Sequence, residues 1–125
     1  MNDEVISTLD KFFELLAAQK WEAANGLLAS GFFAFENGTR YSAHEFIMLV
    51  KDVFANGTRY QWQVTKPEVI ARADIAWVAY HNVGYLNAPG SARTGRHWLE
   101  TAVLSHDGTC WKLCFLSSMR AEIRA

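Results

Sequence analysis

The chain has 125 residues, of which 50% are hydrophobic and 20% are charged, and its 12 Lys and Arg residues nearly balance 13 Asp and Glu residues. This composition predicts one globular domain over residues 1–125 and excludes a disordered, collagen-like or coiled-coil chain. The formal net charge of -1, without a run of basic residues, argues against nucleic acid or an anionic membrane as a partner.

The first half of the chain is predicted to be mainly helical. Apolar residues between positions 5 and 16 recur at three- and four-residue spacing, which predicts a helix with one buried face. A shorter amphipathic stretch at 21–28 forms a hairpin with it, and a short apolar strand follows at 32–35. Ser42 and Glu45 then have the spacing of a capping box, which predicts a third helix that ends at Asn56-Gly57.

From residue 58 onward the hydrophobic period changes from 3.6 to 2. This pattern predicts an antiparallel meander of four long strands, near 58–72, 75–86, 93–105 and 110–119. Strands of this length are expected to bend, and Pro67 and Gly84 are candidate bulge positions. Helices followed by a long sheet have an α+β order, so we expect a cone-shaped barrel of a strongly bent antiparallel sheet, covered by three N-terminal helices.

The chain lacks the sequence features of a secreted or membrane-spanning protein. Its acidic N-terminus has no basic segment followed by an apolar stretch, and no apolar run reaches the ~18 residues of a spanning helix. Cys110 and Cys114 lie about 13 Å apart in an extended strand, which is too far for a disulfide. We therefore expect free thiols and a soluble cytoplasmic protein.

The turn between the last two strands decides which side chains face inward. Asp107-Gly108 is typical of a two-residue hairpin loop, and this loop places Glu100 opposite Phe115 and Trp98 opposite Ser117. We expect this face to line the interior of the cone because it carries the larger aromatic side chains. The expected inward set comprises Tyr60, Trp62, Val64, Ala76, Val78, Tyr80, Asn82, Arg96, Trp98, Glu100, Phe115 and Ser117.

These inward residues predict a ligand pocket. A carboxylate at Glu100 is costly to desolvate among aromatic rings, so we expect an ion pair with Arg96, which lies on the same face of the same strand. Polar groups that converge in an aromatic concavity are typical of a small-molecule site. In the first hypothesis the chain binds a small, largely apolar molecule through Tyr60, Trp62, Tyr80, Asn82, Arg96, Trp98, Glu100, Phe115 and Ser117.

The last two strands also resemble a known family. The segments 98–104, Asp107-Gly108 and 111–120 resemble the final hairpin of the nuclear transport factor 2-like superfamily, and the element order is similar to that of its small bacterial SnoaL-like members. The resemblance implies a cystatin-like cone with an internal pocket, commonly dimerised through the outer sheet face. It implies no single activity, because the superfamily includes isomerases, dehydratases, epoxide hydrolases, dioxygenase small subunits and non-catalytic binding modules. Many relatives carry a histidine where this chain has Ser117, which argues against His-dependent chemistry.

Two further hypotheses remain open. The chain is either an isomerase, dehydratase or hydrolase, in which Glu100 acts as general acid or base with a pKa raised by burial, or a dimeric interaction module. The dimer hypothesis depends on an apolar patch on the outer face, expected at Ile75, Trp77, Ala79, Val83, Leu99 and Leu116. No cofactor is expected, and no metal site, because the histidines lack metal-ligand spacing and no Cys-x-x-Cys motif is present. Whether the loop at 87–93 acts as a lid is left open.

Overall fold

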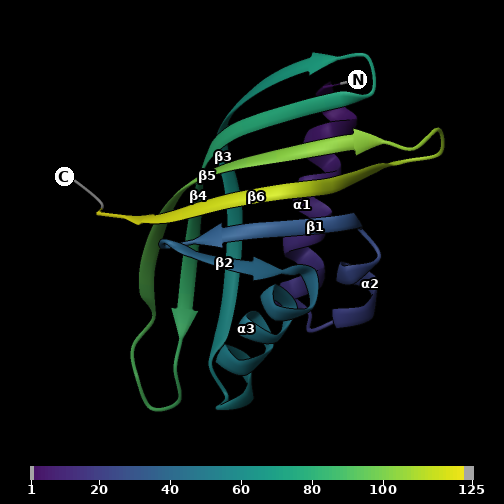
Figure 1. Ribbon diagram of the computed structural model, residues 1–125. Coiled ribbons are helices and arrows are strands. Elements are labelled where there is room, and N and C mark those ends of the chain that lie inside the picture. Colours follow the sequence, from purple (N-terminus) through teal and green to yellow (C-terminus); the bar gives the residue numbers. More distant parts are fainter. Residues whose placement is uncertain (1, 123–125) are drawn as a thin grey trace.

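The computed structural model describes residues 2–122 as a layer of helices packed on one curved sheet (Figure 1). Two helices come first, and the third follows a short hairpin. In chain order the elements are α1 (Asn2–Ala17), α2 (Trp21–Asn25), β1 (Leu28–Glu36), β2 (Thr39–Ser42), α3 (Ala43–Ala55), β3 (Arg59–Arg72), β4 (Ile75–Asn87), β5 (Thr94–His106) and β6 (Trp111–Ala121). The expected α+β architecture is confirmed.

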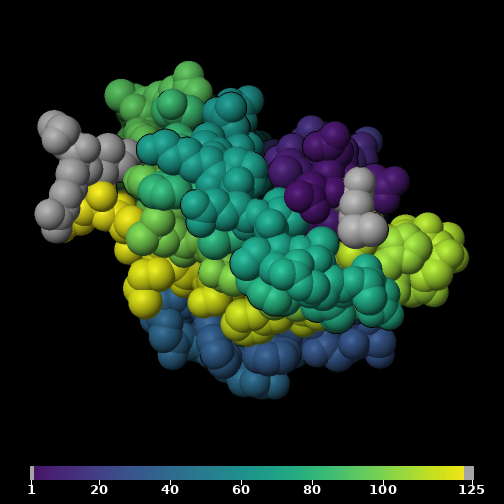
Figure 2. Space-filling model, turned by 90° about the horizontal axis from the view of Figure 1, so that it is seen from above, coloured from purple at the N-terminus to yellow at the C-terminus, as the bar shows by residue number. Residues whose placement is uncertain are grey.

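The six strands form one sheet in the order β2-β1-β6-β5-β4-β3. Strands β3 to β6 make the expected antiparallel meander, whereas β1 lies parallel to β6. In Figure 2 this order can be followed from the blue β1 and β2 through yellow β6 and green β5 to teal β3. The β1–β2 hairpin at Asn37-Gly38 was not expected from the sequence, and the parallel pair brings the first strand beside the last.

The helices bury their apolar faces against the concave side of the sheet. Helix α1 places Val5, Leu9 and Phe12 in the core, as its three- and four-residue spacing predicts. Helix α3 begins with the predicted capping box, in which the Ser42 hydroxyl accepts from the Glu45 backbone N–H and the Glu45 carboxylate accepts from the Ser42 N–H. No helix within residues 2–122 is both long and apolar enough to cross a membrane.

The loop between β5 and β6 is longer than the sequence suggested. His106 pairs with Trp111, so four residues form the connection. The Asp107 carboxylate accepts hydrogen bonds from the backbone N–H groups of Thr109 and Cys110, at 2.8 and 2.9 Å, and these bonds stabilise the wider turn. The expected two-residue loop is therefore wrong.

A β-bulge follows in β6. Leu104 pairs with Leu113 and Val103 with Phe115, so Cys114 is the extra residue. An extra residue reverses the direction of every later side chain in the strand. Leu116 consequently faces the core, with 1% of its surface exposed, and its expected place on the outer face is wrong.

The same bulge corrects two expected pocket residues. Phe115 lies on the outer face, where its ring packs 4.9 Å from Phe33 and 5.3 Å from Phe35. Ser117 also lies on this side and lines a shallow outer hollow with Leu99 and other residues. In their place, Leu116 and Ser118 of β6 face inward.

Of the two candidate bulge positions, only one carries a bulge. The β3–β4 register shifts between Thr65 and Glu68, which places Pro67 inside the irregular segment. Gly84 instead continues both of its strand pairings without a shift. Its small size serves the packing of the pocket described below.

Candidate functional site

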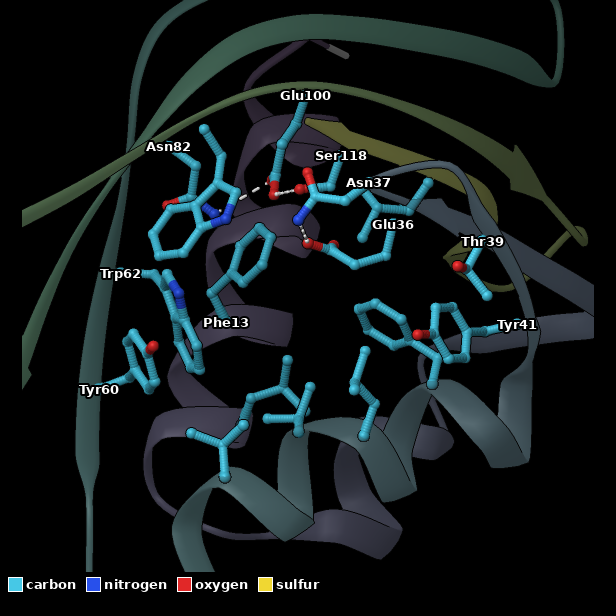
Figure 3. A pocket seen from close by; sticks show the side chains of 17 residues that line it. Phe13, Glu36, Asn37, Thr39, Tyr41, Tyr60, Trp62, Asn82, Glu100 and Ser118 are labelled. Atoms are coloured by element: carbon cyan, nitrogen blue, oxygen red, sulfur yellow. Dashed lines mark hydrogen bonds between the residues drawn. The ribbon is translucent and has the colours of Figure 1, made fainter. Parts of the chain in front are cut away.

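A pocket of about 370 Å³ lies between the concave face of the sheet and helices α1 and α3 (Figure 3). Asn37 and Thr39, which are exposed at the turn between β1 and β2, line one side, so the pocket opens to solvent there. Its volume is within the range of small-molecule sites. The lining residues are Phe13, Leu16, Glu36, Asn37, Thr39, Tyr41, Phe46, Leu49, Val50, Val53, Tyr60, Trp62, Asn82, Trp98, Glu100, Leu116 and Ser118.

A row of polar side chains crosses four neighbouring strands at one end of the pocket. Glu36 of β1 pairs with Ser118 of β6, Ser118 with Glu100 of β5, and Glu100 with Tyr80 of β4. Directly opposed residues on one sheet face have neighbouring side chains. We call these four residues the polar row.

Glu100 is held in the polar row by neutral donors. The Ser118 hydroxyl donates to Glu100 Oε2 at 2.7 Å, and Asn82 Nδ2 donates to Glu100 Oε1 at 3.1 Å. The Tyr80 hydroxyl approaches closely enough to favour the carboxylate, but without the alignment of a full hydrogen bond. Both Glu100 oxygens thus have a donor, and Glu100 is buried.

The expected ion pair between Glu100 and Arg96 is wrong. Arg96 pairs with Gly84 across the sheet, and its guanidinium donates to the Gly95 carbonyl at 3.3 Å. Four residues along an extended strand span about 13 Å, so two side chains on the same face are too far apart for direct contact. Arg96 lines a separate surface hollow near Arg120 and contributes nothing to the inner pocket.

Burial changes the acidity of both pocket carboxyl groups. The pKa of Glu100 is raised by desolvation, although the nearby Tyr80 hydroxyl and the hydrogen bonds from Ser118 and Asn82 oppose that rise. The pKa of Glu36 is raised to about 7, first by desolvation and then by the negative charge of Glu100, while the Ser118 hydroxyl acts in the opposite direction. Glu36 is therefore populated in both protonation states near neutral pH.

Two polar atoms beside these carboxyl groups have no hydrogen-bond partner within the described residues. They are the Tyr80 hydroxyl and Asn82 Oδ1, both buried. The pKa of Tyr80 is raised well above its usual value by burial and by Glu100, so the hydroxyl keeps its proton. Because an unpaired buried polar atom is costly, each is a ready contact for a bound molecule or water.

Aromatic rings form the opposite wall of the pocket. Tyr60 and Trp62 stack with an interplanar angle of 3° and centroids 5.1 Å apart, and Trp98 lies 6.2 Å from Tyr60. Gly84 leaves the space that these indoles occupy, since a Cβ there would lie 2.5 Å from Trp98 Cζ3 and 3.2 Å from Trp62 Cδ1. Phe13 of α1 closes the wall 6.0 Å from Trp62.

The structure brings together most of the predicted inward residues and adds others. Tyr60, Trp62, Asn82, Trp98 and Glu100 line the inner pocket, and Tyr80 completes the polar row without lining it. Sequence reasoning missed Glu36 and Ser118. Glu36 follows the buried Phe32 and Ala34 at alternate positions, so the period-2 pattern of β1, extended by one step, would have found it. Ser118 carried no such signal, because its direction depends on the bulge at Cys114.

The sequence matches a known protein family, and the fold matches solved structures. A model of the SnoaL-like domain family matches residues 5–120. No curated protein matches the chain in sequence.

Several solved structures share the fold at low sequence identity. A candidate dehydratase of the nuclear transport factor 2-like family from Streptomyces avermitilis superposes with a TM-score of 0.85, at 17% identity over 97% of each chain. The association domain of C. elegans CaMKII gives 0.79, at 18% identity over 94% of this chain and 93% of its own. The β subunit of benzoate 1,2-dioxygenase from Burkholderia mallei gives 0.80, at 11% identity over 94% of this chain and 88% of its own. At these identities the likeness concerns the fold alone.

Gly84→Ala tests the packing of the aromatic wall. The added methyl group would overlap Trp98, so we expect a loss of about 1–3 kcal/mol in unfolding free energy, measured by urea denaturation. Gly95→Ala is the matched control on the neighbouring strand, where a Cβ meets nothing within 4 Å, and it should be neutral or slightly stabilising. Equal stability of the two variants would contradict this packing.

Glu36 gives the folding stability a defined pH dependence. Its pKa is about 7 when folded against an ordinary value of 4.5, so the stability from its protonated form is present below about pH 4.5 and is lost as the pH rises through 7. In Glu36→Gln the loss of unfolding free energy between about pH 5 and pH 8 should be smaller than in the wild type by roughly 1–2 kcal/mol. This difference is less than the full pKa shift would give, because Glu36 is only half-buried and solvent screens its charge. Urea denaturation at both pH values measures the effect. Glu22→Gln on α2, which is exposed, should keep the wild-type slope.

Proposed function

The chain belongs to the SnoaL-like domain family, within the nuclear transport factor 2-like superfamily, and from that premise we propose that it binds a small, largely apolar molecule in the inner pocket. The observation that carries the proposal is the division of the pocket into an apolar body and one polar end. Such a division favours a ligand with an apolar body and a single polar group.

The two ends of the pocket have different tasks in this proposal. The stacked rings of Tyr60 and Trp62 and the apolar side chains of α3 enclose the body of the ligand. The polar residues that line the other end, Glu36, Asn82, Glu100 and Ser118, receive its polar group, and Asn82 Oδ1 is the unpaired buried atom among them. The ligand enters past Asn37 and Thr39, where the pocket meets solvent.

A ligand screen with a blocked pocket tests this proposal. Small aromatic ketones, alcohols and amines should raise the melting temperature of the wild type by several degrees, because about 100-fold excess over the Kd adds roughly 2.7 kcal/mol. Val50→Phe fills the pocket from α3 and should abolish the shift, whereas Met48→Phe, on the same helix but exposed, should keep it. If the ligand still raises the melting temperature of Val50→Phe, it binds outside the inner pocket and the proposal is contradicted.

A second candidate function is acid–base catalysis of the isomerase, dehydratase or hydrolase type. The observation that favours it is the pKa of Glu36 near 7, beside a second carboxyl group in an aromatic pocket. Glu36 faces the pocket with only Asn37 donating to it, at 3.3 Å, so it is the more available proton carrier. Glu100, with both oxygens engaged, would orient the polar group or act as the second acid.

Solvent deuterium separates binding from catalysis. Any ligand that stabilises the protein is incubated with it in D₂O and its mass is followed. An acid–base enzyme incorporates deuterium into the ligand's carbon framework or converts it to product, and both Glu36→Gln and Glu100→Gln abolish that change while ligand still binds. A ligand that binds and stays unchanged supports the binding function instead.

The outer face of the sheet supports a further proposal, a homodimer. Ile70, Trp77, Val103, Phe115 and Phe33 lie opposite one another across five neighbouring strands. The side chains of Trp77, Leu99 and Met119 are 38%, 48% and 57% exposed. Such an apolar surface is rarely left uncovered, and the sheet of a second copy would cover it.

The mass in solution tests the dimer. Sedimentation equilibrium at micromolar concentration should give twice the mass of one chain. Leu99→Lys places a charge in the middle of the outer face and should give the mass of one chain, whereas Met48→Lys, exposed on α3, should not change the assembly. A wild-type protein with the mass of a single chain contradicts this interface.

A further inference from the structure

We propose that the ligand of the inner pocket is an organic cation, a protonated amine on an apolar body. This inference rests on the proposed binding function and adds the charge of the ligand to it. Three independent observations support it: the charge of the lining, the hydrogen-bonding capacity of the lining, and the aromatic wall.

The pocket lining carries acidic groups and no basic ones. Of its 17 residues, all within the described part of the chain, two are Glu36 and Glu100 and none is Lys, Arg or His. Three neighbouring basic residues lie outside the lining: the Arg40 guanidinium lies 4.0 Å over the Phe33 ring, Arg96 donates to Gly95, and Arg120 lines a separate surface hollow with Arg96. Ionised carboxyl groups in a buried site require compensation, and a cationic ligand would supply the positive charge that the lining lacks.

The buried polar atom that is left without a partner in the described pocket lining is an acceptor. Asn82 lines the pocket and is 1% exposed, and because its amide nitrogen donates to Glu100, its Oδ1 is left without a partner. The Glu36 carboxyl group accepts a hydrogen bond from the Asn37 amide alone among the described residues, at 3.3 Å (Figure 3). A primary ammonium group supplies three donors and no acceptor, which complements this set.

The aromatic wall suits the same ligand. Trp62 and Tyr60 form a stacked pair beside Trp98, and the faces of such rings attract cations. Leu49 and Val50 of α3 offer the apolar surface that the body of the amine requires. A carboxylic acid of the same shape would meet two carboxyl groups and no positive charge.

The inference also predicts that binding of the ligand releases protons. The titratable groups coupled to Glu36 are Glu100 from β5 and the Tyr80 hydroxyl from β4. The phenols of Tyr41 from β2 and Tyr60 from β3 also line the pocket, and helices α1 and α3 contribute only apolar and aromatic side chains. A cation favours the ionised form of both carboxyl groups. Because Glu36 is partly protonated near neutral pH, amine binding should release protons, and a neutral ligand should release none.

The experiment compares three probes that share one apolar body. Titration calorimetry at about pH 7, where Glu36 is partly protonated, is carried out with 4-phenylbutylamine, 4-phenylbutan-1-ol and 4-phenylbutanoate, in two buffers of different ionisation enthalpy. We expect the amine to bind at least about tenfold more tightly than the alcohol, and the carboxylate to bind most weakly. The amine should give a buffer-dependent enthalpy with the sign of proton release, the alcohol should give none, and any binding of the carboxylate should show the opposite sign.

Variants assign the preference to the pocket carboxyl groups. Glu36→Gln should remove the difference in affinity between the amine and the alcohol, because glutamine keeps the shape and removes the charge. Glu22→Gln removes an exposed carboxylate from α2 and should retain the amine preference. Alcohol binding in Glu36→Gln also shows that the variant is folded.

The possible outcomes distinguish failure of this inference from failure of the proposed binding function. If the alcohol or the carboxylate binds the wild type as tightly as the amine, or if the amine preference persists in Glu36→Gln, the inference is overturned and the binding function stands. If Val50→Phe, which fills the pocket, keeps full affinity for all three probes, or if none of them binds the wild type, both are contradicted.

Discussion

The extra residue in β6 is the constraint on which both faces of the sheet depend. Because Cys114 is accommodated as a bulge, Leu116 enters the core and Ser118 faces Glu100, while Phe115 is turned toward Phe33 on the other side. A regular strand would exchange these roles and leave a buried carboxyl group without its shortest hydrogen bond. The pocket and the apolar outer surface are thus two results of one backbone irregularity.

Around Glu100 the protein keeps a carboxyl group buried by means of neutral hydrogen-bond donors. Ser118 and Asn82 occupy its two oxygens, yet neither brings a charge, so desolvation still raises its pKa. Glu36, on the far side of Ser118, experiences both burial and the charge of Glu100. Structural salt bridges give the opposite result, since a nearby cation holds a carboxyl group in its ionised form. The absence of one from the described pocket lining distinguishes this site from a purely structural network.

The sequence alone predicted the helices, the four-strand meander and the part of the site that lies on β3, β4 and β5. Strands β4 and β5 pair without a shift, so alternation alone placed Asn82 and Glu100 on the inner face. Alternation gave the wrong faces in β6 for two reasons. The length of the preceding loop depends on hydrogen bonds that the Asp107 carboxylate accepts from the backbone, and no residue type marks the bulge at Cys114. The ion pair with Arg96 failed for a different reason: alternation describes which face a side chain takes but ignores distance along the strand.

The parallel pairing of β1 with β6 has a consequence for how the site is assembled. The hydrogen bond from Arg120 to Asn37 joins positions 83 residues apart, and the contact of Glu36 with Ser118 depends on the same strand pair. Closing a contact across so long a stretch of chain costs more conformational entropy than closing a local hairpin. A partly folded chain that has formed the β3–β5 meander therefore holds Glu100 without Ser118 or Glu36 beside it. The complete polar row, and with it the polar end of the pocket, exists only where the sheet has closed from β1 to β6.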